Sequence, residues 1–121
     1  MYMNNLDFLK SNDVNVDQSL ELLGDVEMYN DVLSDFLDEA SKRLVDMENF
    51  INASDMANYA VLAHSMKSDS KYLGFTKLAE ISLNHELKGK ENDSEYVVNN
   101  FNELKQETNR ILNVVREYLG K

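Results

Sequence analysis

Apolar residues recur every three or four positions along most of the chain, which is the spacing of amphipathic helices. Long segments with this pattern cover residues 25–51, 55–73, 75 to about 89, and 94–119. Two shorter stretches, residues 3–9 and 17–23, predict brief helical turns ahead of them, and Gly24 closes the second. Alternation with a period of two is not sustained anywhere, so the pattern predicts no strand.

Four long helices with short connections favour an all-α, up-and-down antiparallel four-helix bundle with a short N-terminal helical lead-in. We expect residues 1–121 to form a single domain, because the chain is long enough for one core but not for two. Ser54 is the expected N-cap of the second long helix.

The inward face of each long helix can be read from its apolar positions. In the second helix this face is Met56, Tyr59, Ala60, Ala63, Met66, Ser70 and Leu73. The third helix carries Phe75, Leu78, Ala79, Ile81, Leu83 and Leu87. The fourth carries Val97, Val98, Phe101, Leu104, Thr108, Ile111, Leu112, Val115, Tyr118 and Leu119.

Charge and composition narrow the classes of partner. The formal net charge is −10, which argues against nucleic acid and against anionic membrane surfaces. No apolar run is long enough to span a membrane, and no signal-peptide pattern opens the chain. The absence of cysteine excludes thiolate chemistry. We therefore expect a soluble, cytoplasmic, monomeric protein.

Candidate chemistry gathers on one side of the second helix, beside its inward face. His64 shares that side with Lys67, Ser68 and Lys71, which follow at helical spacing, and the small residues Ala57 and Ala60 precede it. A neutral imidazole is a good nucleophile toward phosphorus, and nearby ammonium groups offset the charge of a phosphoryl group. This face therefore indicates phosphoryl transfer.

Other sites have weaker support. No glycine-rich nucleotide loop or magnesium-ligand cluster is present, so we expect no ATP site and no bound cofactor. His85 is expected to be structural or exposed, because a metal site at His85 and Glu86 lacks further ligands.

The stretch AHSMKSDSKYLGFTKL, residues 63–78, resembles the signature of histidine-containing phosphotransfer (HPt) domains. That signature is an Ala-His pair, an apolar residue, a lysine, a glycine ten residues after the histidine, and an apolar residue four further on. The matching positions are Ala63, His64, Met66, Lys67, Gly74 and Leu78. Residues 16–40 also look like the family's usual short helix followed by a long first helix, so the resemblance covers nearly the whole chain.

The resemblance implies a phosphocarrier without kinase activity of its own. His64 is implied as the phosphoacceptor and Lys67 as the group that stabilises the phosphoryl group, with Lys71 adding charge at longer range. Glu86 follows His64 by 22 residues, as does a glutamate in the similar phosphotransfer domain of chemotaxis histidine kinases, where it bonds the inner ring nitrogen. Gly74 is implied to allow close packing where the second helix turns into the third.

The implied partners are the receiver domain of a response regulator and a sensor or hybrid histidine kinase. Magnesium is expected on the partner receiver domain and not on this chain. The implied docking surface includes Ala57, Ala60, Ser68, Tyr72 and Gly74. Ser68 departs from the family, which usually has glycine directly after the lysine, and a side chain there could slow transfer or narrow the choice of partner.

Three alternatives stay open on the sequence. The chain could dock on receivers with little or no transfer, as the presence of Ser68 in place of the usual glycine suggests. It could be the N-terminal phosphotransfer part of a chemotaxis-type kinase, as the run Gly74-Phe75-Thr76 and Glu86 suggest. It could also be a structural bundle in which His64 has no chemical role.

Overall fold

The computed structural model describes residues 5–121. Its six helices are α1 (Leu6–Ser11), α2 (Val16–Leu23), α3 (Val26–Asn52), α4 (Met56–Leu73), α5 (Thr76–Lys90) and α6 (Ser94–Leu119). No strand occurs among residues 5–121, so the all-α prediction is confirmed. The predicted first turn, residues 3–9, is replaced by α1, and its positions 3 and 4 lie outside the described residues.

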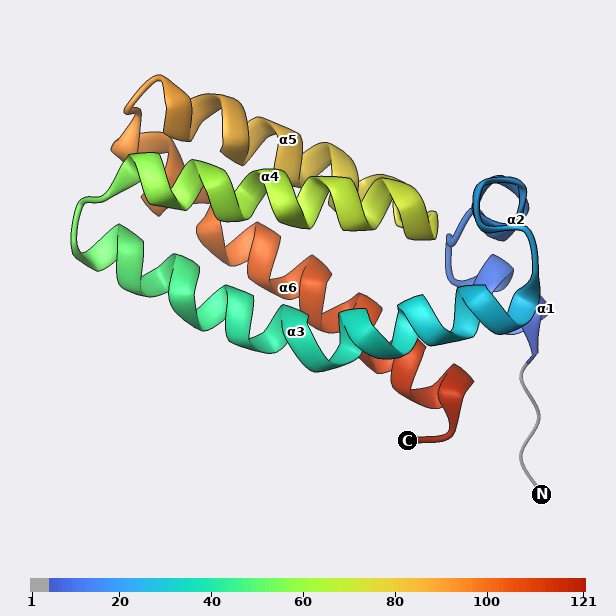
Figure 1. The fold of residues 1–121 in the computed structure, drawn as a ribbon. Helices are drawn as coiled ribbons and strands as arrows, with labels where there is room; N and C mark the ends of the chain where they lie inside the picture. Colours follow the sequence, from blue (N-terminus) through green and yellow to red (C-terminus); the bar gives the residue numbers. More distant parts are fainter. Residues whose placement is uncertain (1–4) are drawn as a thin grey trace.

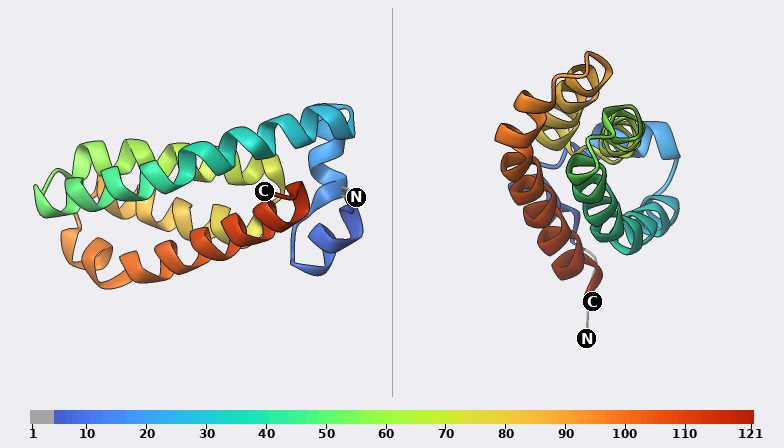
Figure 2. Two further views of the ribbon diagram at one scale, coloured as in Figure 1. Left: turned by 90° about the horizontal axis from the view of Figure 1, so that it is seen from below. Right: turned by 90° about the vertical axis from the view of Figure 1, so that its left-hand side faces the viewer.

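The four long helices form an antiparallel bundle, and short turns reverse the chain at each end (Figure 1). Each long helix packs against two others, in the cyclic order α3, α4, α5, α6. The short helices α1 and α2 lie together at the end of the bundle where α4 ends and α5 begins (Figures 1 and 2). The α4–α5 pair has the most extensive contact, so groups on these two helices are held in a fixed relation.

Aspartate side chains begin three of the long helices. Asp25, Asp55 and Asp93 each accept a hydrogen bond from the backbone N–H three residues on, which satisfies a donor that the helix itself leaves free. The prediction that Ser54 caps the second long helix was wrong. Ser54 has a positive φ of 54° in the turn before the helix, so Asp55 takes the capping position.

The core lies between the long helices, and the predicted inward faces supply most of it. All seven predicted positions of α4 are buried. Two predicted apolar positions on the other helices are on the surface instead, since Leu87 is 46% exposed and Val98 is 56% exposed. Three polar residues of α5 are buried in addition: Ser82, His85 and Glu86.

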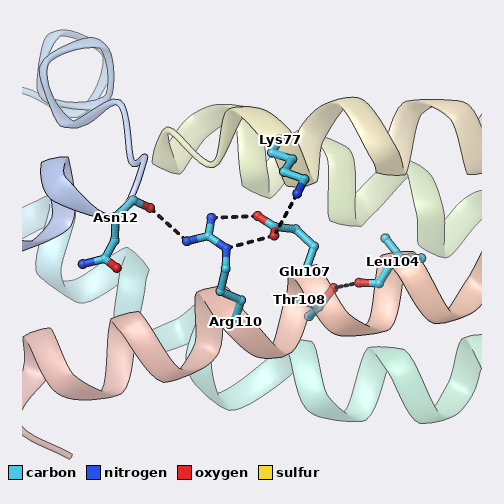
Figure 3. Close-up of polar contacts among 6 residues, drawn as sticks. All are labelled: Asn12, Lys77, Leu104, Glu107, Thr108 and Arg110. Atoms are coloured by element: carbon cyan, nitrogen blue, oxygen red, sulfur yellow. Dashed lines mark hydrogen bonds and ion pairs between the residues drawn. The ribbon is translucent and has the colours of Figure 1, made fainter.

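Arg110 of α6, held by a partly buried ion pair with Glu107, attaches the lead-in of α1 and α2 to the bundle (Figure 3). Both carboxylate oxygens of Glu107 accept hydrogen bonds from the Arg110 guanidinium, at 2.8 and 2.9 Å, and Lys77 of α5 approaches one of them at 4.0 Å. The same guanidinium donates to the backbone carbonyl of Asn12, between α1 and α2, at 3.1 Å. One arginine of α6 therefore ties together the last helix and the lead-in.

The lead-in also packs on the turn between α4 and α5. Gly74 ends α4 with a positive φ of 85°, and its carbonyl accepts a hydrogen bond from the backbone N–H of Asn15 at 2.8 Å. A Cβ at Gly74 would overlap the backbone of Asn15, whose carbonyl carbon would be 2.8 Å away. Glycine is therefore required here both by the backbone conformation and by the lack of space.

Candidate functional site

His64 lies near the middle of α4, on the side of the helix that faces outward along the boundary with α5. The buried stripe of α4 turns Ala63 and Met66 toward the core, which leaves the neighbouring His64 at the surface. Its side chain is 55% exposed. The ring is thus held on a rigid helix while one of its edges remains open to solvent.

Glu86 of α5 holds the inner edge of the His64 ring. The distance from His64 Nδ1 to Glu86 Oε2 is 2.8 Å. The Glu86 side chain is only 3% exposed, so this contact is shielded from water. An ionised carboxylate can only accept hydrogen bonds, so in the neutral imidazole Nδ1 carries the proton and the lone pair lies on the outer nitrogen, Nε2.

Two lysines hold the same carboxylate. Lys67 Nζ lies 2.7 Å from Glu86 Oε1, and Lys90 Nζ lies 2.9 Å from Oε2. Burial opposes ionisation of Glu86, but the bonds from Lys67, Lys90 and His64 outweigh it and lower the pKa of its carboxyl to about 2. Glu86 is therefore a fixed negative charge beside the imidazole at neutral pH.

The lysine contacts differ from the sequence-based expectation. Lys67 was expected to stabilise a phosphoryl group on His64, and no pairing with Glu86 was predicted, whereas its side chain is 16% exposed and paired with Glu86. Lys90 was not predicted as a site residue, because the apolar pattern predicted a helix that ends at about residue 89, whereas α5 continues to Lys90. The signal that could have identified it is the spacing of Glu86 and Lys90, four residues apart with the acid first.

The other predicted residues of α4 lie further along the same face. Ser68, Lys71 and Tyr72 are exposed and line a cavity of about 690 Å³ between α4, α5 and α2. Gln18 and Leu22 of α2 form one wall of it. The structure therefore brings a part of the lead-in next to the predicted docking residues.

A smaller groove of about 360 Å³ lies beside His64 toward the other end of α4. Ala57, which is exposed, lines it together with Ala60 and Lys90. Ala60 is only 4% exposed, because it packs on Gly89 of α5, where an added Cβ would lie 3.1 Å from the Ala60 Cβ. The prediction of Ala60 as an exposed docking residue therefore needs correction, since its main contact is inside the bundle.

Gly74 also differs from its predicted place on the docking surface. It is buried against Asn15 at the end of α4. Its close packing is with the lead-in of its own chain, so the structure gives it an internal role.

His85 is completely buried, although it adjoins Glu86 in sequence. Its Nδ1 lies 2.8 Å from the hydroxyl oxygen of Tyr59 on α4, and its ring makes an edge contact with Tyr96. Burial lowers the pKa of the His85 imidazole to about 4, against a smaller opposing effect of the Asn100 backbone. His85 is thus a neutral core residue at the boundary of α4 and α5.

Two other kinds of feature are absent from the part of the chain that the structure describes. Residues 5–121 contain no group of three or more histidine, cysteine, aspartate or glutamate side chains placed to hold a metal ion. None of the helices within these residues has both the length and the apolar composition needed to cross a membrane.

One of three comparisons with known proteins gives a match. No curated protein and no solved structure matches the chain. A family model, that of the Hpt domain, matches residues 31–114, which include α4 and α5 with His64 and Glu86. This match covers more than half of the chain. The protein therefore belongs to the Hpt domain family, whose members carry phosphoryl groups in two-component signal transduction.

Proposed function

We propose that this protein accepts a phosphoryl group on His64 Nε2 from the aspartyl phosphate of one receiver domain and passes it to the aspartate of another. The observation that carries the proposal is the asymmetry of the His64 ring. Its inner nitrogen is bonded to a buried carboxylate, and the half-exposed side chain leaves the outer nitrogen accessible to a partner.

The chemistry is a direct displacement at phosphorus. The Nε2 lone pair attacks the phosphorus atom, the N–P bond forms, and the P–O bond to the receiver's carboxyl group breaks. The carboxylate leaves with the electron pair, and the ring proton stays on Nδ1. Because the ring becomes more positive during attack, the Glu86 carboxylate at 2.8 Å stabilises the transition state and the phosphorylated ring.

The surrounding cations favour a dianionic group at this position. Lys67 and Lys90 together carry two positive charges against the single negative charge of Glu86. Lys71 is exposed one turn beyond Lys67 and adds charge at longer range. In this proposal magnesium belongs to the receiver domain, and this chain contributes the oriented nucleophile and its charged neighbours.

The proposed docking surface follows the outer side of α4. Ala57 lies on one side of His64, and Ser68 and Tyr72 lie on the other. Tyr72 is 45% exposed, and exposed aromatic side chains are frequent anchors of protein interfaces. Ser68 stands one turn after His64, so its hydroxyl lies within the surface that a receiver must approach.

A second candidate function is the phosphotransfer part of a chemotaxis-type kinase. The bond between Glu86 and His64 favours it, because the glutamate at this offset is the feature that resembles that class. The two functions differ in phosphoryl donor. A carrier takes its phosphoryl group from a receiver, whereas a kinase part takes it from an ATP-binding kinase domain.

The test uses isolated receiver domains phosphorylated with radiolabelled phosphate and mixed with the wild-type protein or with His64→Gln. Acid-labile, base-stable label on the wild type alone would support the proposal. Label from an ATP-loaded kinase domain but from no receiver would favour the kinase part. Binding of receivers without label would favour a docking module, and neither binding nor label would contradict phosphotransfer altogether.

A further inference from the structure

Three groups contact the two oxygens of the Glu86 carboxylate, namely two lysine ammonium groups and the His64 ring. Lys67 approaches Oε1, whereas His64 Nδ1 and Lys90 Nζ both approach Oε2, at 2.8 and 2.9 Å. His64 and Lys67 come from α4, and Lys90 comes from the same helix as Glu86. Lys90 is thus the one donor among these three that fixes the carboxylate relative to its own helix.

We propose that Lys90 is a positioning residue of the phosphotransfer site, which holds the Glu86 carboxylate against the imidazole of His64. This inference rests on the proposed function of His64. Lys90 acts through Glu86, so we expect it to set the orientation of the ring and not the affinity for a receiver.

The local packing places Lys90 where this role requires it. The preceding residue, Gly89, packs directly on Ala60, so α5 approaches α4 closely in its last turn. Lys90 follows Glu86 by one helical turn, and its ammonium group lies over the groove that His64 and Ala57 also line. A larger residue at position 89 would separate the helices at the point where Lys90 and His64 share an oxygen.

Burial explains why the third donor matters. A carboxylate that is 3% exposed has little access to water, so its lone pairs depend on protein donors. Without Lys90, Oε2 keeps the His64 bond alone, and the carboxylate can rotate about its side-chain torsions while Oε1 stays with Lys67. The ring then spends less time in the orientation that attack requires, and transfer slows.

The experiment compares the wild type with Lys90→Met, Lys90→Arg and Lys88→Met. Methionine keeps much of the aliphatic stem without the charge, and arginine keeps both the charge and the donors. Lys88 is the matched control, since it lies two residues earlier on α5 and contacts Glu91, Asp93 and Tyr96 instead of Glu86. Single-turnover transfer from a phosphorylated receiver gives the rate at saturation and the receiver concentration for half the maximal rate.

We expect Lys90→Met to lower the saturating rate roughly three- to tenfold with an unchanged concentration dependence. Lys90→Arg should restore most of the rate, and Lys88→Met should match the wild type. In ¹⁵N spectra recorded without a receiver, His64 should have its proton on Nδ1 in the wild type and a mixture of both tautomers in Lys90→Met.

Three results would overturn the inference. An unchanged or faster saturating rate in Lys90→Met would show that the lysine does not hold a useful geometry. A change confined to the concentration dependence would make Lys90 a docking residue, and slower transfer with unaltered His64 spectra would place its action on the phosphoryl group. If the wild type accepts no phosphoryl group at all, the proposed function fails, and the tautomer spectra still decide the positioning role.

Discussion

Glu86 is the residue on which the geometry of the site depends, because His64, Lys67 and Lys90 all contact its carboxylate. Replacing it by glutamine keeps the size and an acceptor oxygen but removes the negative charge. We expect Glu86→Gln to lower the rate of phosphoryl transfer about 10- to 100-fold, since the charge that forms on the ring is no longer offset.

Transfer from a phosphorylated receiver, followed in single turnovers, measures this effect. Glu103→Gln is a suitable control, because Glu103 is an exposed glutamate of α6. If both variants transfer at the wild-type rate, Glu86 has a purely structural role.

His85 makes a separate prediction about stability. Its folded-state pKa is about 4, below its ordinary value of 6.5, because the buried ring resists protonation. Between these two values the unfolded chain binds more protons than the folded protein, so the free energy of unfolding falls as the pH falls from 6.5 toward 4. Glu86 acts in the same direction over a lower range, since its stabilising charge is lost only as the pH drops below its ordinary value of 4.5 toward 2.

Urea unfolding of the wild type and of His85→Gln at several pH values separates the two groups. The loss of stability between pH 6.5 and about 4.5 should be present in the wild type and absent from His85→Gln. An equal slope in both proteins would show that another group titrates in this window.

The sequence could predict the position of His64 but only part of its surroundings. Helical spacing placed Lys67, Ser68 and Lys71 beside the ring, and the structure agrees on the shared face. The pairing of Lys67 with Glu86, and the arrival of Lys90 at the same carboxylate, depend on how closely α5 packs on α4. Spacing along one helix contains no information about that distance.

At the scale of the helix, α4 and α5 show what an apolar pattern can and cannot predict. The buried face of α4 was predicted completely, because this face meets an ordinary apolar core. In α5, Leu87 is exposed while His85 and Glu86 are buried, since each of these polar groups finds a partner across the boundary with α4. In the sequence, a polar residue that is buried because it pairs with a group on another helix cannot be distinguished from an exposed polar residue.

The turn between α4 and α5 gives a prediction at the same scale. Gly74 and Gly24 both have positive φ values, 85° and 95°, but only Gly74 lacks space for a Cβ, whereas nothing lies within 4 Å at Gly24. We expect Gly24→Ala to lower the free energy of unfolding by about 1 kcal/mol, from backbone strain alone. Gly74→Ala should lower it by at least about 2 kcal/mol, because the added methyl group also displaces Asn15.

Chemical denaturation of the two variants measures the difference. Equal losses of stability would mean that the lead-in moves away from Gly74 without cost, and that its packing on the turn contributes little.

The charge of the whole molecule is unevenly distributed. Residues 56–90, which include α4 and α5, hold five lysines and three acidic residues, whereas the rest of the chain holds seven basic and nineteen acidic residues. One of the three acids, Glu86, is buried beneath the site. Helix α4, which carries His64, and its neighbour α5 are therefore the basic part of a strongly acidic protein.

This distribution should orient a phosphorylated receiver, because an aspartyl phosphate is anionic. We expect the association rate constant of the wild type to fall as the salt concentration rises. At a fixed low salt concentration, we expect Lys71→Glu to associate several-fold more slowly than the wild type. Lys105→Glu, on α6, changes the net charge by the same amount away from α4 and should have a smaller effect. Equal effects of the two substitutions would mean that net charge alone governs the encounter.

The attachment of the lead-in has a consequence for how the protein is made. Asn12 leaves the ribosome well before Arg110, which holds its carbonyl and is synthesised 98 residues later. The backbone N–H of Asn15 likewise can bond to the Gly74 carbonyl only after Gly74 has been synthesised. Helices α1 and α2 are too short to be stable alone, so they remain unstructured until Arg110 has emerged. Helices α1 and α2 are thus synthesised before the residues that hold them, and they reach their final places only after those residues.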